Sequence, residues 1–376
     1  MKTAFIYSEK FGSFHYGLDH PMRPVRLKLA YELMEELKLL GLPDSGIVPA
    51  RQATDSELEL FHTREYVRVL KEANTGIIPV DGSVHGLGFG DNPVFNGVYE
   101  WSAWSAGASI QAAELVASGK AKTAFNIAGG LHHAMPNRAS GFCYINDAAV
   151  AIKRLVALGK RVAYIDIDAH HGDGVEYAFY DTDRVLTISL HENGQWLFPG
   201  TGFVTDTGVG VGKGYSVNVP MPPSTQDALY LKAFNAIVPP FIEAFAPDVI
   251  VTQLGVDSFE TDPLTHLSLT TNSFEKMVLA FRSFNIPWVA LGGGGYDLSN
   301  VARAWTLAWA VMNNIKPPVN IPEEFLRKNG DIFRAKALRD LPLALFPMRD
   351  EEIRQVDEDI AFLINKVLPV VKAGKA

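Results

Sequence analysis

The sequence predicts an α/β protein built on a single, mainly parallel β-sheet with helices on both faces. Two observations lead to this fold class. Short, continuously apolar runs alternate along the chain with longer segments of helical periodicity, and most of the apolar runs end in glycines or polar side chains. Strands buried on both faces have continuous apolar sequences, and strands that alternate with helices form parallel sheets.

The predicted strands have the length and composition of buried strands. In chain order they are Thr3–Tyr7, Thr123–Ala128, Arg161–Asp168, Val185–His191, Tyr215–Pro220, Asp248–Leu254 and Trp288–Leu291. The segments between them carry apolar residues three and four positions apart, which is the spacing of an amphipathic helix. The predicted helices are Arg26–Leu40, Tyr99–Ser118, Asp147–Leu158, Gly174–Tyr180, Thr225–Ala244, Thr271–Phe284 and Leu298–Asn313.

The pattern predicts one large domain, because no linker-like or low-complexity segment interrupts it before about residue 315. We expect this domain to cover residues 1–320, with residues 321–376 forming a C-terminal helical extension packed on the same domain. The extension ends in a predicted helix, Glu351–Val371. Residues 74–95 are rich in glycine without periodicity, which is typical of a functional loop.

Composition narrows the functional classes. The chain has 376 residues, of which 47% are hydrophobic and 20% charged, and it is long enough to bury a sizeable core. A net charge of −8 argues against nonspecific binding to nucleic acid or acidic membranes. The single cysteine, Cys143, excludes an intramolecular disulfide. With no signal region at Met1–Ser8 and no segment of transmembrane length, we expect a soluble, cytoplasmic protein.

The segment Ala163–Gly174 carries three carboxylates and two imidazoles directly after an apolar run. Residues two apart on a strand face the same side, so we expect Asp166, Asp168 and His170 to project together from the carboxyl end of a strand. Open α/β sheets bind ligands at that end. Burying these groups costs several kcal/mol per ion unless something compensates. The segment therefore predicts half of a divalent metal site.

Further segments at predicted strand ends carry reactive side chains. They are Gly129–His133 with Gly141–Asp147, Gly255–Phe259, Gly292–Asp297, and Ser189–His191 with Phe198–Gly202. Paired histidines can bind a metal or act as an acid–base pair, and consecutive glycines let the backbone approach another group closely. A lone buried histidine or aspartate is more often structural, and we assign that role to His191. The joint occurrence of these segments at successive strand ends favours a functional site.

These segments carry a resemblance to a known family. Gly129–His133, Gly141–Asp147, Tyr164–Gly174, Gly255–Asp257 and Gly292–Tyr296 resemble the motif set of the histone deacetylase superfamily in order and spacing. Within it, the chain is most similar to the bacterial acetoin-utilisation-type and class I-like deacetylases. The resemblance spans about residues 1–320 and implies the arginase/deacetylase fold. It also implies hydrolysis of the acyl amide of acetyl-lysine in a protein or peptide, or of a related small acyl amine.

The resemblance implies one zinc ion, with Asp168, His170 and Asp257 as its ligands. Three protein ligands leave room for water and substrate, as in catalytic zinc sites. The ion would polarise the amide carbonyl and lower the pKa of its water.

The resemblance also implies the catalytic residues. His132 would pair with Asp166 and His133 with Asp173, because a carboxylate behind an imidazole fixes its tautomer and raises its basicity. We assign His133 as general base and acid and His132 as its electrostatic partner. Tyr296 would donate a hydrogen bond to the tetrahedral oxyanion.

The substrate positions implied by the resemblance form a narrow apolar tunnel for a neutral four-methylene stem. Its walls would be Gly141, Phe142, Phe198 and Leu264, and Asp91 would hold the substrate backbone at the rim. Relatives specialised for acetylpolyamines carry an acid near the mouth, where this chain has Leu264. This difference favours acyl-lysine.

The family also binds potassium. One matching site comprises Asp166, Asp168, His170, Ser189 and Leu190. A second comprises Phe179, Thr182, Val185 and Tyr215.

Two positions depart from the family pattern, and three other functions stay open. Leu131 replaces a tryptophan common in class I members, and Asp297 follows the catalytic tyrosine where Asn or His is usual. A binuclear manganese ureohydrolase needs a second aspartate at the position of Phe259. An acetylpolyamine or small acyl-amide hydrolase would share the catalytic residues. A catalytically weak acyl-lysine-binding module should lose Tyr296 or a histidine, and this chain retains them.

Overall fold

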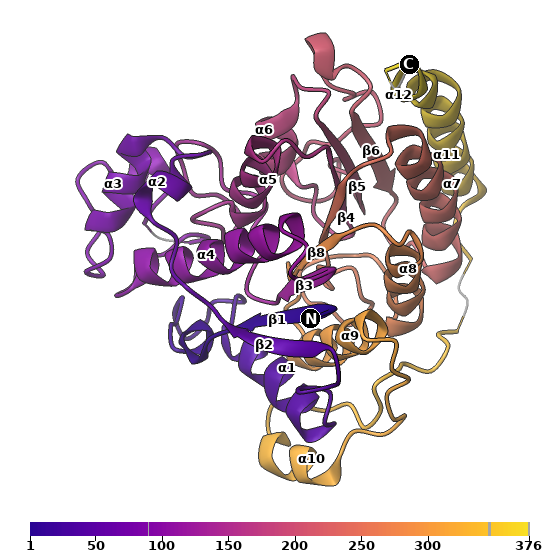
Figure 1. The fold of residues 1–376 in the computed structure, drawn as a ribbon. Helices are drawn as coiled ribbons and strands as arrows, with labels where there is room; N and C mark the ends of the chain where they lie inside the picture. Colours follow the sequence, from indigo (N-terminus) through magenta and orange to yellow (C-terminus); the bar gives the residue numbers. More distant parts are fainter. Residues whose placement is uncertain (89, 345–346, 375–376) are drawn as a thin grey trace.

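The computed structural model describes residues 1–88, 90–344 and 347–374, and its centre is one parallel sheet of eight strands (Figure 1). The strand order is β2-β1-β3-β8-β7-β4-β5-β6. The bounds are β1 Thr3–Tyr7, β2 Ser45–Pro49, β3 Thr123–Asn126, β4 Val162–Asp166, β5 Val185–Glu192, β6 Ser216–Met221, β7 Val249–Gln253 and β8 Trp288–Leu291. The predicted fold class is confirmed, and each predicted strand is present.

The strand that the sequence did not predict is β2, at the edge of the sheet. It pairs with β1 from Thr3 opposite Ser45 to Tyr7 opposite Pro49. Its residues are only partly buried, and it contains a glycine and a proline. An edge strand of this kind has no continuous apolar sequence, and proline is tolerated there because one side of the strand needs no partner.

Helices cover both faces of the sheet (Figure 1). One face carries α4 Val98–Ala117, α5 Asp147–Ala157 and α6 Asp173–Phe179. The other carries α1 Val25–Glu36, α7 Asp227–Phe245, α8 Thr271–Ser283 and α9 Leu298–Met312. The shorter helices α2 Asp55–Leu58 and α3 Arg64–Glu72 precede α4, and α10 Glu323–Asn329 follows α9. Among the described residues, no helix has the length and apolar character needed to cross a membrane.

The C-terminal part of the chain packs on the second face. Helix α11, Asp350–Phe362, contacts α7 and β6, and α12, Leu368–Ala373, contacts α7 (Figure 1). A π-helical turn, Leu363–Val367, joins them. The single predicted helix Glu351–Val371 is therefore three consecutive helical pieces. The division at residue 320 stays a prediction.

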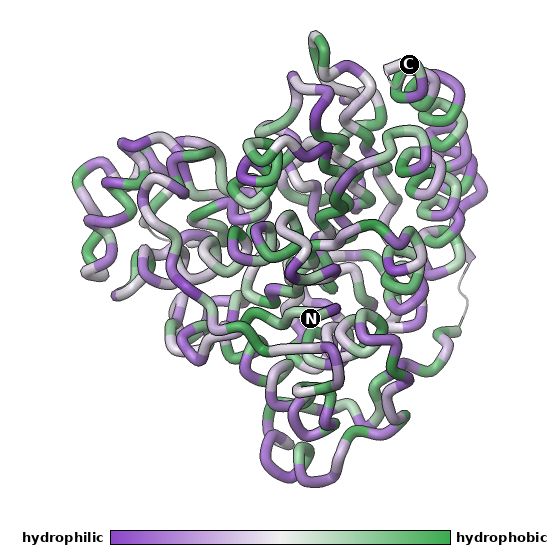
Figure 2. The backbone as a smooth tube through the Cα atoms, viewed as in Figure 1, coloured by the Kyte–Doolittle hydropathy of each residue, from purple (hydrophilic) through white to green (hydrophobic). Residues whose placement is uncertain are grey.

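The strands form the most buried part of the molecule, since nearly all residues of β3 to β8 are shielded from solvent. Figure 2 shows hydrophobic stretches gathered where strands and helices pack and hydrophilic ones along the outer loops. A second apolar cluster, which includes Tyr66, Trp101, Leu131 and Tyr144, lies beneath the loops that follow β3. This cluster gives the loops with reactive side chains a packed base.

Candidate active site

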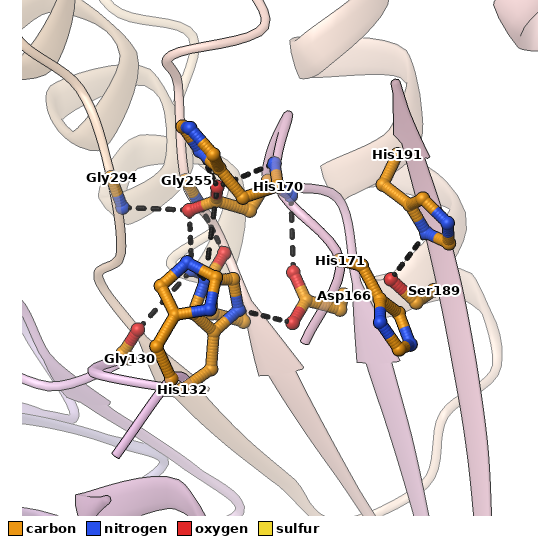
Figure 3. A network of polar contacts seen from close by, with 12 residues as sticks. Gly130, His132, Asp166, His170, His171, Ser189, His191, Gly255 and Gly294 are labelled. Carbon is orange, nitrogen blue, oxygen red and sulfur yellow. Dashed lines mark hydrogen bonds and ion pairs between the residues drawn. The ribbon is translucent and has the colours of Figure 1, made fainter. Parts of the chain in front are cut away.

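The reactive segments follow four strands that are neighbours in the sheet. In sheet order these strands are β3, β8, β7 and β4, and the loops after them carry His132, Tyr296, Asp257 and Asp168. Because all the strands are parallel, their carboxyl ends meet at one edge. Segments that are up to about 170 residues apart in sequence thus converge there (Figure 3).

The chain leaves β4 through two successive turns that aim its side chains. The Asp166 carboxylate accepts the backbone N–H of Asp168 at 3.1 Å, and the Asp168 carboxylate accepts that of His170 at 3.0 Å. The strand itself ends at Asp166, so the alternation expected along a strand does not extend to His170. The three side chains still gather at the carboxyl end of β4: His132 lies 2.8 Å from Asp166 and 3.9 Å from Asp168, and His170 lies 3.2 Å from Asp168.

Asp168, His170 and Asp257 form a buried group with the donor atoms of a metal site. One ligand atom from each lies within 4.8 Å of the others. His170 Nδ1 is 3.2 Å from Asp168 Oδ1 and 3.0 Å from Asp257 Oδ2. Burial, and then the charge of Asp168, raises the pKa of Asp257 to about 6. Two carboxylates that repel one another in a dry site fit a divalent cation, which would compensate both.

Backbone and amide groups hold the metal-site carboxylates in place. Asp168 Oδ2 accepts the N–H of Gly294 at 2.8 Å and the side-chain amide of Gln253 at 2.6 Å. A side chain at Gly255 would place its Cβ 2.1 Å from that same oxygen, and one at Gly294 would lie 2.1 Å from Asp257 Oδ2. The glycines are therefore required because the backbone passes against the carboxylates (Figure 3).

The two histidines after β3 lie beside this group, each with a carboxylate behind it. His132 Nδ1 is 2.8 Å from Asp166 Oδ2, and His133 Nδ1 is 2.7 Å from Asp173 Oδ1. Their Nε2 atoms face one another at 3.0 Å. Asp166 also accepts the hydroxyl of Tyr164 at 2.6 Å. With both Nδ1 atoms donating to carboxylates, the two Nε2 atoms are left to exchange a proton.

The surroundings of His132 and His133 give the two imidazoles different pKa values. Burial lowers the pKa of His132, but the charges of Asp166 and Asp168 outweigh it and raise that pKa to about 9. Burial and then the positive charge of His132 lower the pKa of His133 to about 4. At neutral pH, these groups by themselves leave His132 charged and His133 neutral.

Tyr296 is fixed to the opposite side of the site through its backbone. Its N–H donates to Asp262 Oδ2 at 2.8 Å, and the other oxygen of Asp262 accepts the N–H of Leu264 at 3.0 Å. Burial, followed by the charges of Asp257 and Asp168, raises the pKa of the Tyr296 hydroxyl well above its usual value. The hydroxyl is therefore a permanent donor near neutral pH.

The departure at Asp297 has a structural explanation. Its carboxylate caps α9 by accepting the N–H groups of Ser299 and Asn300, and it accepts the hydroxyl of Thr261 at 2.9 Å. A carboxylate at the start of this helix accepts backbone N–H groups that have no partner within the helix, and its negative charge complements the helix dipole. Leu131, the other departure, is buried in the apolar cluster beneath the loop.

Three of the residues predicted to line the tunnel, Gly141, Phe142 and Phe198, lie beside the histidines or the tyrosine. The ring of Phe198 lies 5.0 Å from that of His133, and the ring of Phe142 lies 5.7 Å from that of Tyr296. A Cβ on Gly141 would meet both His133 and Phe198 within 2.8 Å.

Asp91, the residue predicted for the rim, is exposed, and its backbone carbonyl is 3.2 Å from Nε2 of His20. Phe89 of the same glycine-rich loop lies outside the described residues.

The positions predicted for potassium lie next to the site and at the far end of α6. Ser189 and Leu190 are on β5, beside Asp166 on β4. Ser189 Oγ lies 2.9 Å from His191 Nδ1, and the rings of His191 and His171 lie 4.7 Å apart and tilted by 47°, so the structural role expected for His191 fits its surroundings (Figure 3). The second set sits where α6 turns into β5 and just before β6; it comprises Phe179, Thr182, Val185 and Tyr215.

Several supporting residues were given no role from the sequence. Asp147 accepts the N–H groups of Gly130 and Leu131, and so fixes the turn before the histidine pair. Asn146 caps α5 and donates to the carbonyls of His132 and Ala134. The available signal was an Asn–Asp pair at a helix start. The roles of Gln253 and Asp262 depend on contacts between distant segments and left no local signal.

Comparisons with known proteins agree with this arrangement. Residues 20–312 match the model of the histone deacetylase domain. The acetoin utilization protein AcuC of Bacillus subtilis is 42% identical over 87% of this chain and 86% of its own length. Histone deacetylase clr6 of Schizosaccharomyces pombe is 39% identical over 90% of this chain and 83% of its own length.

The fold is shared as well. The crystal structure of an HDAC homolog from Aquifex aeolicus superposes with a TM-score of 0.87 at 35% identity, and it covers 96% of this chain and 100% of that one. The chain therefore belongs to the histone deacetylase family and is a hydrolase of the deacetylase class.

Proposed function

We propose that this deacetylase is zinc-dependent and hydrolyses the acyl amide of acetyl-lysine. The observation that carries the proposal is the buried group Asp168–His170–Asp257 beside two imidazoles, each backed by a carboxylate. Two carboxylates and one imidazole form a three-ligand set suited to catalytic zinc. When bound, zinc supplies Lewis acidity to the amide carbonyl and to the attacking water.

The residues of the chain divide the proton transfers between them. His133, neutral near pH 7, takes the proton of the attacking water at Nε2 and later gives it to the leaving amine. His132, held charged by Asp166, stabilises the negative charge that develops beside it. Asp173 keeps the proton of His133 on Nδ1 and so leaves Nε2 free to act as the base.

Tyr296 supplies the remaining stabilisation. Its protonated hydroxyl donates to the oxyanion that forms when water adds to the carbonyl. Its ring lies against Phe142, so its position is set by packing as well as by the Asp262 contact.

The substrate class is inferred from the side chains expected to line the tunnel. Gly141, Phe142, Phe198 and Leu264 offer apolar surface to a neutral methylene stem, and Asp91 at the rim offers a carboxylate to the substrate backbone. A second candidate is an acetylpolyamine, whose distal ammonium needs an acid at the mouth. Leu264 gives no charge there, so we favour acyl-lysine.

We also propose the two potassium sites that the resemblance implies. Asp166 is shared by the first site and by His132, so the ion next to it changes the basicity of the histidine pair. Replacing potassium with sodium or lithium at constant ionic strength should change kcat without changing zinc content.

A substrate panel with one matched variant tests the proposal. Zinc-loaded wild type and Tyr296→Phe are assayed on acyl-lysine peptides and N-acetylpolyamines, with metal content measured on the same samples. We expect the variant to lose about 10²–10³-fold in kcat while zinc stays near one per chain. Zinc bound without turnover of any substrate would favour a binding module instead. If an acetylpolyamine is the best substrate, the proposed substrate class is wrong, but the proposed mechanism still holds.

A further inference from the structure

A further histidine–carboxylate pair, Glu192–His266, lies outside the catalytic residues. Glu192 is the last residue of β5, and its side chain is fully buried. His266 donates its backbone N–H to Oε2 at 2.8 Å, and its Nδ1 lies 2.8 Å from Oε1. A buried carboxylate is tolerated only when its oxygens are satisfied, and both of these oxygens are satisfied by one residue.

The pair connects two segments that each carry one of the expected tunnel residues, Phe198 and Leu264. Glu192 begins the segment that reaches Phe198 six residues later, and Phe198 lies 5.0 Å from His133. His266 is two residues after Leu264 in the loop that follows Asp257. Glu192 therefore links the segment of Phe198 to the loop of Leu264 through His266.

The loop around His266 is held at three further points, two of them at the catalytic site. Thr265 donates its hydroxyl to the carbonyl of Asp257, and Asp262 accepts the N–H of Tyr296. The carbonyl of His266 accepts the N–H of Ser224 at 2.6 Å. Leu264 thus lies between two anchors, its own N–H on Asp262 and His266 on Glu192, and loss of the Glu192 contact would release the second of them.

The outer side of His266 is open. Its side chain is 62% exposed and borders a cleft of about 1190 Å³ that is also lined by Trp196, Ser224 and Gln355. Glu192 therefore holds the imidazole from the inside, and on the other side the loop has room to swing outward.

We propose that the Glu192–His266 pair is a positioning device that sets the width of the tunnel mouth and thereby selects a slender acyl-lysine stem over wider ones. The inference rests on the proposed function, because it assumes that substrate enters between Phe198 and Leu264. Neither residue touches the reacting atoms, so the pair acts on substrate binding and not on the chemical step.

Three variants separate this role from a structural one. His266→Leu removes the donor on the side chain. Glu192→Gln keeps the shape but turns one acceptor into a donor. His266→Asn is the matched control, since its amide nitrogen occupies the place of Nδ1 and can still donate to Glu192.

The variants are assayed as full-length, zinc-loaded proteins on two peptides. One carries acetyl-lysine, and the other carries p-acetamidophenylalanine, an acetylated amine on a wider, rigid stem. In His266→Leu and Glu192→Gln we expect KM for acetyl-lysine to rise about tenfold with kcat nearly unchanged, since only binding is lost. The kcat/KM preference for the slender stem should fall about tenfold, and His266→Asn should restore both.

The possible failures are distinguishable. Unchanged KM and unchanged preference in both disrupting variants would overturn the proposal, as would a fall in kcat at constant KM. Absence of hydrolysis in the wild type would overturn the proposed function itself. Because Glu192→Gln is isosteric, it keeps the test decisive even where His266→Leu does not fold.

Discussion

Removing the positive charge of His132 should move the pH dependence of the enzyme in a defined direction. The change is His132→Asn, whose side-chain amide can still donate to Asp166 but carries no charge. In the wild type, burial and the charge of His132 hold the pKa of His133 at about 4. Loss of that charge leaves burial and the charge of His170 opposed by Asp173, so the pKa of His133 rises.

The size of the shift can be bounded from the geometry. The two rings lie 4.0 Å apart. A unit charge at that distance costs about 4 kcal/mol at an effective dielectric of 20, which corresponds to about 3 pKa units. Reorganisation around the site absorbs part of this, so we expect a rise of at least about one unit.

The assay is the pH profile of kcat/KM on an acetyl-lysine peptide, because its acidic limb reports the essential base of the free enzyme. The limb should lie at higher pH in His132→Asn than in the wild type, with zinc content unchanged. A limb that stays in place or moves to lower pH would refute the assignment of His133 as base and His132 as the charged partner.

Three further predictions test the site and its supports. Gln253→Ala removes a partner of a ligand and should weaken zinc affinity about 10–100-fold, as measured by chelator competition. Asp257→Asn removes a ligand and should weaken zinc affinity by a larger factor. Equal losses in the two variants would contradict the ligand assignment. Asp297→Ala should cost about 1 kcal/mol of unfolding free energy in urea through loss of the α9 cap, whereas Asp297→Asn, which keeps the acceptor, should cost less. Burial lowers the pKa of His62 from 6.5 to about 4, so the unfolded chain takes up the proton first as the solution is acidified. The free energy of unfolding should therefore fall by about 3 kcal/mol as the pH is lowered from about 6.5 to about 4. In His62→Gln this part of the fall should be absent. An identical pH dependence of stability in the two proteins would exclude His62 as the cause.

The fold was predictable because it depends on short-range sequence patterns. Continuous apolar strands such as Val249–Gln253 and glycine-rich turns such as Gly292–Gly295 can be recognised without knowing their neighbours. The half-exposed strand β2 and the short helix α3 were not recognised. An edge strand with glycine and proline lacks the apolar pattern that identifies a strand.

The reactive residues and their pairings were predictable from the family motifs, but the backbone turns and distant contacts that hold them were not. Period-two alternation places Asp166, Asp168 and His170 on one strand, yet β4 ends at Asp166 and two turns, closed by the Asp166 and Asp168 carboxylates, carry the chain to His170. The contact of Glu192 with His266 spans 74 positions in sequence. Such a contact is created by the sheet order, which local patterns do not encode.

Zinc titration of the metal-free enzyme tests the central claim most directly. Turnover of an acetyl-lysine peptide is followed as zinc is added in steps, with bound metal counted at each step. The Asp168–His170–Asp257 group predicts that activity rises in proportion to bound zinc and saturates at one ion per chain. Saturation at two ions, or full zinc binding without turnover, would contradict it.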